Sequence, residues 1–307
     1  MSELTAQLGP AERARAAGVA QQNARLVEVH SEGVYRRMVF EVSEIAELAR
    51  PGQFVSLTVG GELSAALLRR SFSIYRAQSP IGPGPGRIEL IVAACGQGTR
   101  WLTSRGPGEV LDMVGPLGRP FPLPTQPTPC VLVGGGYGSA PLFWLTAALR
   151  ERGCAVSLVL GAGSKDRLFG VLEAQRLVDH VSVTTDDGSL GMTGLVSDAL
   201  PSAIEQIEAG VVYACGPMPM LRAVQEVAQA QGVVSQLAVE ESMACGIGVC
   251  MTCVVPVVGR DGVTRMVRSC VEGPVFRGDR IRWDAIEDGR CSVPSDALGA
   301  LVAEGHS

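Results

Sequence analysis

Four cysteines in the last quarter of the chain constrain what it can fold into more than any other feature. Cys245, Cys250 and Cys253 lie in the run ACGIGVCMTC, and Cys270 follows in VRSC. The spacing is Cys-x4-Cys-x2-Cys, with sixteen residues before the fourth cysteine. Plant-type [2Fe–2S] sites have this spacing, whereas structural zinc sites usually combine two close pairs of ligands. The spacing therefore favours an iron–sulfur cluster in a small C-terminal module.

The residues between these cysteines fit the same prediction. Gly246 and Gly248 permit a positive φ, so backbone N–H groups can turn toward the sulfur atoms and stabilise negative charge. The side chains of Ala244, Ile247 and Met251 would keep water away. A zinc site and unligated thiols stay open as alternatives. The other cysteines stand singly and are expected to act as small hydrophobic residues: Cys95, Cys130, Cys154, Cys215 and Cys291.

The composition leaves room for larger neighbours of this module. The chain has 307 residues, 46% of them hydrophobic, which is enough for two or three domains with their own cores. A net charge of −5 without a basic run argues against nucleic-acid binding. No apolar run could span a bilayer, and the first residues lack the apolar region of a secretory signal. We therefore expect a cytoplasmic protein with neither nucleic acid nor membrane among its partners.

The segment 24–126 has the pattern of an antiparallel barrel. Short runs rich in Val, Ile or Phe alternate with Gly/Pro turns, and no helical pattern separates them. The runs lie at 26–29, 35–42, 53–59, 71–77, 87–94 and 109–115. They predict a six-stranded antiparallel β-barrel. Residues 1–23 show no core pattern and are expected to form an N-terminal extension.

The segment 127–232 follows a proline-dense connector and alternates apolar runs with helical spacing, which predicts an α/β domain with a parallel sheet. Two glycine-rich turns, VGGGYGSAPL and YACGPMPML, follow predicted strands. Because ligands of open α/β sheets bind at such strand ends, the two turns indicate a nucleotide site. Ser139 stands where the dinucleotide fingerprint has its third glycine, so the match to that fingerprint is poor. Residues 233–307 comprise the cluster module and a C-terminal tail.

Two segments of the barrel offer contacts to phosphate groups. LLRRSFSIY places Arg69 and Arg70 beside an aromatic ring and two hydroxyls, and arginine N–H groups can grip a phosphate oxygen pair. The alternative is a pair of solvated edge charges. CGQGTRWLT offers backbone donors at Gly96, Gly98 and Thr99, or is a plain turn between a strand and a helix.

Eight motifs occur in an order that carries a family resemblance: LLRRSFSI, CGQGTRWL, GPLGRPF, VLVGGGYGSAPL, TTDDGSLG, YACGPMPML, EESMACGIGVCMTC and EGPVFRGDRIRW. From about Arg25 to Trp283 the chain resembles the ferredoxin-reductase superfamily. Within it, the chain is most similar to the electron-transfer subunits of two-subunit, NAD-linked dihydroorotate dehydrogenases. The resemblance implies FAD in the barrel, NAD(H) in the α/β domain and a plant-type [2Fe–2S] cluster in the C-terminal module.

The resemblance also implies which residues hold these cofactors. Those expected at the flavin and its pyrophosphate are Arg70, Phe72 and Ser73, with Gly98 and Thr99 beside the FAD phosphates. Those expected in the dinucleotide turn are Gly134, Gly135, Gly136 and Gly138. Those expected near the nicotinamide end are Asp187, Cys215, Gly216 and Pro217. The expected cluster ligands are Cys245, Cys250, Cys253 and Cys270.

The implied function is electron transfer in pyrimidine biosynthesis. An FMN-bearing catalytic subunit, in a heterotetramer of two catalytic and two transfer subunits, would deliver single electrons through the cluster to FAD and then to NAD. No side chain of this chain need act as an acid or base. We expect the loops 246–249 and 251–255 to be partly exposed for the partner. Lys165 and Arg167 could reach a 2′-phosphate, so the residues leave NAD against NADP open.

Two alternative functions remain at this point. One is the small subunit of an electron-bifurcating ferredoxin–NADP oxidoreductase or of a sulfide dehydrogenase. The family pattern of bifurcating subunits tends to have aspartate in place of one cluster cysteine, and this chain keeps all four. The other is a zinc-stabilised interaction module without redox activity.

Overall fold

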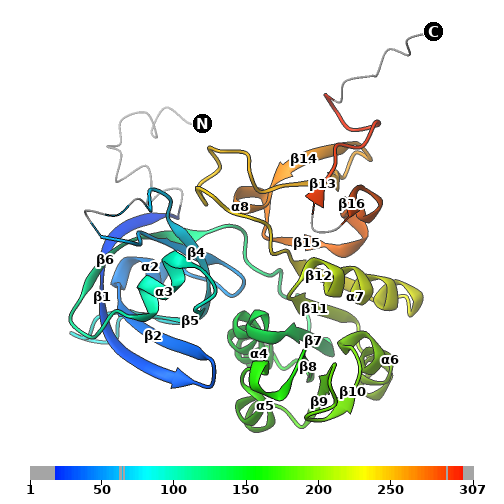
Figure 1. Cartoon of the computed structure of the whole chain (residues 1–307). Helices are drawn as coiled ribbons and strands as arrows, with labels where there is room; N and C mark the ends of the chain where they lie inside the picture. Colours follow the sequence, from blue (N-terminus) through cyan, green and yellow to red (C-terminus); the bar gives the residue numbers. More distant parts are fainter. Residues whose placement is uncertain (1–17, 62–63, 65, 288–289, 300–307) are drawn as a thin grey trace.

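The computed structural model describes residues 18–61, 64, 66–287 and 290–299, which form three parts (Figure 1). A β-barrel lies on the left of the view, an α/β domain at the lower right, and the cysteine-bearing module at the upper right. Most of the predicted N-terminal extension and the end of the tail lie outside the described residues.

The barrel is closed by six antiparallel strands in the order β1-β2-β5-β4-β3-β6, which confirms the predicted architecture. The strands are β1 (Ala20–Glu32), β2 (Tyr35–Glu41), β3 (Phe54–Leu57), β4 (Arg70–Gln78), β5 (Arg87–Ala93) and β6 (Val110–Leu117). Two short helices lie between strands, α2 (Ser43–Leu48) and α3 (Gln97–Thr103). Side chains fill the interior of the barrel, as in other small barrels, among them Leu26, Met38, Phe40, Leu90 and Met113.

Strand β1 begins at Ala20, ahead of the predicted start of the barrel at residue 24. Ala20 and Ala24 are both buried in the barrel core, and Ala20 pairs with Gly115 of β6. Two small alanines separated by polar residues give a weak hydrophobic signal, which explains why the pattern alone places this boundary late.

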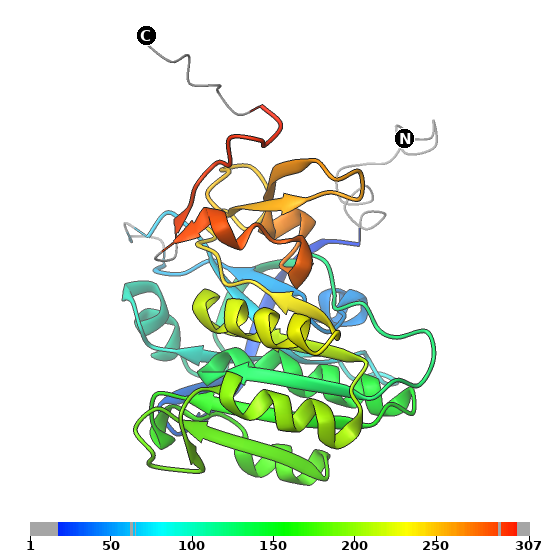
Figure 2. The ribbon, with the colours of Figure 1, turned by 90° about the vertical axis from the view of Figure 1, so that its right-hand side faces the viewer.

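The α/β domain is built on a seven-stranded sheet in the order β10-β9-β8-β7-β11-β12-β15. Its strands are β7 (Cys130–Gly135), β8 (Val156–Ala162), β9 (His180–Thr185), β10 (Met192–Thr193), β11 (Val211–Cys215), β12 (Val234–Ala238) and β15 (Val275–Arg277). Helices α4 (Ala140–Glu151) and α5 (Val171–Leu177) pack on one face, and α6 (Val196–Ile207) and α7 (Met218–Ala230) on the other (Figure 2). Every neighbouring pair is parallel except β12 and β15.

The edge of this sheet crosses into the segment predicted to be a separate module. Strand β12 follows the expected boundary at residue 232 and pairs in parallel with β11, and β15 adds to it antiparallel after the fourth cysteine. The rest of the module is the hairpin of β13 (Val254–Val258) and β14 (Thr264–Arg268), with α8 (Ser269–Glu272), β16 (Ile286–Glu287) and β17 (Arg290–Cys291). The module is therefore joined to the α/β domain by backbone hydrogen bonds.

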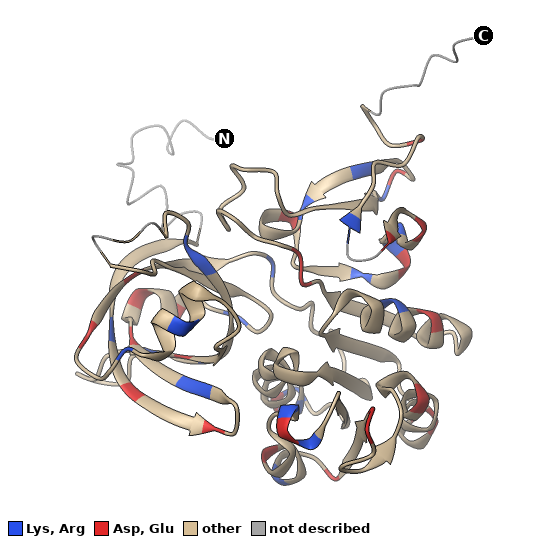
Figure 3. Cartoon of the chain, in the orientation of Figure 1, with Lys and Arg blue, Asp and Glu red and all other residues tan. Residues whose placement is uncertain are grey.

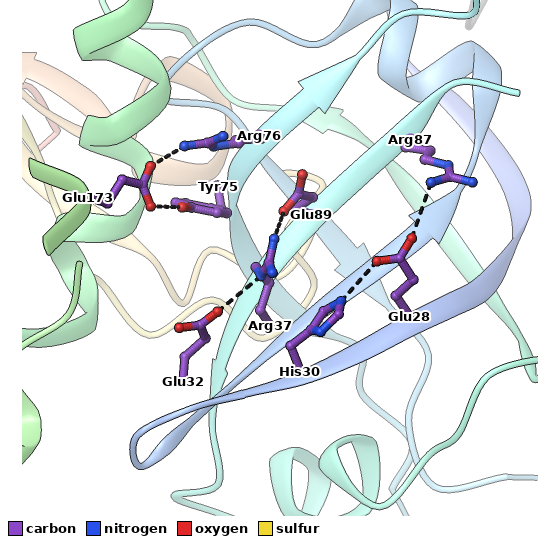
Figure 4. Close-up of polar contacts among 9 residues, drawn as sticks. All are labelled: Glu28, His30, Glu32, Arg37, Tyr75, Arg76, Arg87, Glu89 and Glu173. Atoms are coloured by element: carbon purple, nitrogen blue, oxygen red, sulfur yellow. Dashed lines mark hydrogen bonds and ion pairs between the residues drawn. The ribbon is translucent and has the colours of Figure 1, made fainter. Parts of the chain in front are cut away.

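The barrel and the α/β domain are joined by side chains instead. Tyr75 and Arg76 of β4 both contact the carboxylate of Glu173 in α5, and the Tyr75 hydroxyl donates to it (Figure 4). The Tyr35 hydroxyl donates to the carbonyl of Arg167 at 2.7 Å. Phe169 meets Tyr75 edge to face, with ring centroids 5.6 Å apart, a favourable geometry for aromatic pairs.

Charged residues are interspersed over all three parts of the chain (Figure 3). On the barrel wall they pair locally, where Arg37 bonds Glu89 and Glu32, and Glu28 bonds both His30 and Arg87 (Figure 4). No helix in the described residues is long and apolar enough to cross a bilayer.

Candidate cofactor sites

The four clustered cysteines form two pairs that differ in exposure. Cys245 and Cys250 belong to the loop before β13, where Cys250 is exposed, whereas Cys253 and Cys270 are buried. The N–H groups of Val249 and Cys250 lie 3.4 and 3.5 Å from the Cys245 sulfur as donors. In the described residues, no three Cys, His, Asp or Glu side chains stand close enough to hold a metal ion as they are placed.

The electrostatics of the two pairs differ accordingly. The Thr252 hydroxyl donates to the Cys250 sulfur at 3.1 Å. Hydrogen bonds from Thr252, and after them contacts with Cys245, lower the pKa of Cys250 to about 6. Burial raises the pKa of Cys270 to about 12, and the neighbouring Cys253 adds to this effect. The electrostatic effect of the Cys245 sulfur also raises the pKa of Cys270. These interactions link Cys250 to Cys245, and Cys270 to both Cys253 and Cys245. Thiolates are stabilised where a cation compensates their charge.

Backbone and side-chain details fit the predicted cluster. Gly246, Gly248 and Met251 all have positive φ, between 60° and 84°, so the loop curls around the sulfurs. The buried hydroxyls of Ser56 and Ser269 have no hydrogen-bond partner among the described residues. Ser269 adjoins Cys270, and Ser56 Oγ lies 3.5 Å from the position of a Cβ on Gly246. Two unsatisfied buried donors beside a sulfur-rich loop match a group with acceptor sulfurs.

Arg268, the last residue of β14, ties the cysteine loop to the fourth cysteine. Its Nη1 donates to the carbonyl of Gly248 at 2.8 Å, and its Nη2 pairs with Glu272 of α8 at 3.1 Å. Cys253 and Cys270 lie close enough to act on its charge. A fixed cation therefore stands beside the sulfurs, and no motif of the sequence marked it.

A cavity of about 400 Å³ opens between the barrel and the α/β domain. It is lined by three of the predicted flavin residues, Arg70, Phe72 and Ser73, and by Gly138 and Cys215 from the α/β domain. Arg69 and Arg70 differ in whether a carboxylate compensates their charge. Arg69 is neutralised by Asp112 at 2.6 Å, whereas Arg70 bonds only the carbonyls of Leu68 and Arg69 among the described residues.

Gly98 and Thr99 do not line this cavity, nor do they line the larger cavity over the carboxyl ends of the parallel strands. A Cβ on Gly98 would lie 3.0 Å from Arg70 Nε, so Gly98 packs directly against that guanidinium. The Thr99 hydroxyl accepts from the Gly96 N–H at 2.9 Å and thereby caps α3. A role for Thr99 at a phosphate stays a prediction.

A second cavity, of about 740 Å³, lies over the carboxyl ends of the parallel strands. Gly135, Gly136 and Pro217 line it, and the two glycine turns meet beside it, where a Cβ on Gly138 would lie 2.9 Å from the Cα of Gly216. Gly134 is buried below, 2.4 Å from Ser139 by the same measure. These contacts explain the glycines by close backbone packing. A volume of this size lies in the range of cofactor sites.

Asp187 does not line this cavity, whereas its neighbour Asp186 does. The Asp187 carboxylate accepts from the N–H and hydroxyl of Ser189 at 3.0 and 2.6 Å, and these contacts lower the pKa of Asp187. The sequence does not distinguish the two residues, because the direction of adjacent side chains after a strand depends on where the strand ends.

Tyr137 and Glu240 line both cavities and mark where they meet. The Glu240 side chain faces the open cavity but has protein around most of it, and this desolvation raises its pKa. Burial, followed by the nearby Glu240, raises the pKa of Tyr137 to about 12. Sequence reasoning missed both residues. Tyr137 sits inside a glycine motif that draws attention to its backbone, and Glu240 opens the motif EESMACGIGVCMTC, whose cysteines draw attention instead.

Two family models match separate segments of the chain. The sequence model described as the iron–sulfur cluster binding domain of dihydroorotate dehydrogenase B matches residues 240–282. The model described as an oxidoreductase NAD-binding domain matches residues 132–226. The chain therefore carries an iron–sulfur binding domain and an NAD-binding oxidoreductase domain.

The fold recurs in solved structures of oxidoreductases. An NADH-dependent reduced ferredoxin–NADP oxidoreductase, described for flavin-based electron bifurcation, superposes with a TM-score of 0.73 and 30% identity over 86% of this chain and 91% of that one. A ferredoxin NADP+ reductase from Neisseria gonorrhoeae, with bound FAD and NADP, gives a TM-score of 0.54 and 16% identity over 69% of this chain and 92% of that one. The second likeness concerns the fold alone.

Two curated relatives cover most of the chain. The protein of Desulforamulus reducens named dihydroorotate dehydrogenase B (NAD(+)), electron transfer subunit, is 34% identical over 80% of this chain and 92% of its own length. The protein of the same name from Geobacillus thermodenitrificans is 38% identical over 77% of this chain and 88% of its own. The chain belongs to the family of electron transfer subunits of dihydroorotate dehydrogenase B, an oxidoreductase family.

Proposed function

We propose that the chain carries electrons from an FMN-bearing dihydroorotate dehydrogenase catalytic subunit to NAD in pyrimidine biosynthesis. Its four clustered cysteines would hold a [2Fe–2S] cluster, the cavity beside Arg70 an FAD, and the larger cavity NAD(H). When bound, the cluster supplies one-electron transfer and the flavin links it to hydride transfer. The family membership and the two matched domains support this function.

One observation carries the proposal: the flavin cavity lies between the other two sites. Phe54 lines this cavity and packs in the same small core as Cys253 and Cys270. Ser71, also in its wall, has its Oγ 3.0 Å from the position of a Cβ on Gly246 of the cysteine loop. On the other side, the cavity shares Tyr137 and Glu240 with the nucleotide cavity. The sites therefore form a row in the order that electron transfer requires.

The chain contributes binding and placement in this proposal. Arg70 offers an uncompensated positive charge to a pyrophosphate, and Gly98 lets that side chain lie flat against α3. The glycine turns bring backbone N–H groups to the nucleotide. The proposed domains are an extension at 1–23, the FAD barrel at 24–126, the NAD domain at 127–232 and the cluster module at 233–307, whose strands β12 and β15 complete the sheet of the NAD domain.

The partner surface is proposed beside the exposed cysteine. Ile247, Val249 and Met251 are 52, 76 and 52% exposed and surround Cys250, and an apolar patch of this kind is typical of a protein interface. The two loops are partly exposed, as expected, because these three side chains are open to solvent whereas Gly246, Cys253 and Val255 are buried. We propose a heterotetramer of two catalytic and two transfer subunits, which native mass spectrometry of the co-expressed pair would measure.

An anaerobic titration of the purified chain with NADH tests the proposal. Bleaching of a flavin absorbance band, followed by the electron paramagnetic resonance signal of a reduced [2Fe–2S] cluster, is the expected result. Addition of the catalytic subunit should then couple dihydroorotate oxidation to NAD+ reduction. A colourless protein that contains zinc and ignores NADH would show that the chain is an interaction module.

A second candidate function is the small subunit of an electron-bifurcating oxidoreductase. The observation in its favour is the TM-score of 0.73 to a structure described for flavin-based bifurcation. The two functions differ in their partner. Activity with a ferredoxin and NADP in place of dihydroorotate and its FMN subunit would favour this candidate.

A further inference from the structure

The nucleotide cavity has two distinguishable ends. Tyr137 and Glu240, where it meets the flavin cavity, form one end. Gly163, Arg167 and Asp186, at or after the carboxyl ends of β8 and β9, also line it. Because the sheet runs β9-β8-β7-β11, with the first glycine turn after β7, these three residues lie on the side away from β11.

This arrangement fixes the direction of a dinucleotide in the proposed function. The nicotinamide ring must approach the flavin, so it occupies the end beside Tyr137 and Glu240. The pyrophosphate then lies over the glycine turn after β7. The adenosine half extends over β8 and β9, where its ribose comes to Asp186 and Arg167.

Asp186 is the carboxylate placed to meet that ribose. Its backbone N–H donates to the carbonyl of Ala162 at 3.1 Å, which continues the pairing of β8 and β9. Its Oδ2 lies 3.7 Å from the position of a Cβ on Gly163, so the carboxylate stands over a residue with no side chain. Asp187, the next residue, is turned away into its contacts with Ser189.

Arg167 lines the same end of the cavity, whereas Lys165 does not. The carbonyl of Arg167 accepts from the Tyr35 hydroxyl at 2.7 Å, which fixes its backbone to the barrel. The end of the cavity thus holds one anionic and one cationic side chain. A carboxylate accepts a hydrogen bond from a ribose 2′-hydroxyl but repels a 2′-phosphate, and an arginine attracts a phosphate.

We infer that Asp186 makes this chain select dinucleotides with a free 2′-hydroxyl, and that Arg167 would hold a 2′-phosphate once that carboxylate is removed. The inference deepens the proposed function, on whose nucleotide site it rests. It assigns the preference for NAD over NADP to one side chain. The sequence alone left that preference open, because Lys165 and Arg167 could both reach a 2′-phosphate.

Calorimetric binding of 5′-AMP and 2′,5′-ADP to the full chain tests the inference without any electron transfer. The wild type should bind 5′-AMP more tightly. Asp186→Ser should improve binding of 2′,5′-ADP relative to 5′-AMP by roughly tenfold, the equivalent of about 1.4 kcal/mol. Asp186→Ser combined with Arg167→Ala should lose that gain. Asp166→Ser is the matched control, because Asp166 is a nearby exposed carboxylate outside the cavity lining and should leave the ratio unchanged.

Several results would overturn the inference. They are a wild type that prefers 2′,5′-ADP, an unchanged ratio in Asp186→Ser, or a larger change in Asp187→Ser. An equal change in Asp166→Ser would reduce the effect to net charge. Failure of the proposed function would give a different result, because NADH would then not reduce the flavin bound to the chain. If NADH reduces the flavin and the ratio does not respond to Asp186, only the inference fails.

Discussion

The flavin cavity has two unlike neighbours, the cysteine loop and the nucleotide cavity. The cysteine loop is pressed against the barrel, with Gly246 buried and a Cβ at that position only 3.0 Å from Ser71 Oγ. The nucleotide side keeps about 740 Å³ of open volume. The difference fits the proposed function of each side. Electrons would cross between the cysteine loop and the flavin cavity, which needs a short fixed gap. A dinucleotide must enter and leave the nucleotide cavity, which needs open volume.

The largest expected effect concerns the cysteine side. Cys250→Ser should abolish the [2Fe–2S] signal, because it removes one ligand of the cluster. Dihydroorotate-linked activity should fall by at least about a hundredfold, because electrons from the catalytic subunit would then have no path to the flavin. Reduction of a dye by NADH should survive, because it uses the nucleotide side alone. Cys95→Ser, which removes another exposed cysteine, should keep the cluster signal. If dye reduction vanished in Cys250→Ser with flavin still bound, the two sides would not be separate.

The tightness of the cysteine side can be tested at Gly246. Gly246→Ala introduces a Cβ at φ +72° and 3.0 Å from Ser71 Oγ, and the backbone strain alone costs about 1–2 kcal/mol. Gly262→Ala is the matched control, with φ +78° in the same module and nothing within 4 Å. Thermal unfolding and iron content should fall further in the first variant than in the second. Equal losses would mean that contact with the barrel contributes nothing.

Arg268 should have a smaller effect on the same side. Arg268→Met removes a charge beside the sulfurs and the bond to Gly248, so the cluster should become harder to reduce and more readily lost. Roughly a fewfold lower fraction of reduced cluster at a fixed NADH/NAD+ ratio is expected. Arg268→Lys should restore part of it. Arg265→Met is the control, because Arg265 is also in β14 and also ion-paired, with Asp261 at 2.7 Å, but interacts with none of the cysteines in the described residues. An equal change there would mean that only net charge matters.

The smallest expected effect concerns the nucleotide side, at Glu240. Desolvation raises its pKa in the folded state, so its contribution is present at acidic pH and is lost as the pH rises through that value. Glu240→Gln does not ionise and avoids the loss. The difference in Tm, variant minus wild type, should therefore grow from pH 4 to pH 8. A difference that stays constant with pH would show that Glu240 is well solvated.

Sequence patterns were sufficient for the elements with strong local signals. The six barrel strands follow from alternating Val, Ile and Phe, and the α/β domain from its alternating runs. The start at Ala20 and the strands β12 and β15 were not predictable, because short segments pair according to a neighbour distant in sequence. The same limit applies to the sites. The cysteines and glycines can be recognised from their spacing in the sequence. The roles of Glu240, Arg268 and Asp186 depend on the cavities and sulfur atoms that lie beside them in the fold.

The shared sheet between the nucleotide domain and the cysteine module has a consequence for any attempt to divide this protein. A chain cut after residue 232 would lack β12 and leave β11, still paired with β7, as the edge strand of the sheet, with the N–H and carbonyl groups of its other side open to other chains. The cluster module therefore cannot be transferred by itself to another reductase. Evolution or an engineer who exchanges the cluster must exchange part of the nucleotide domain with it.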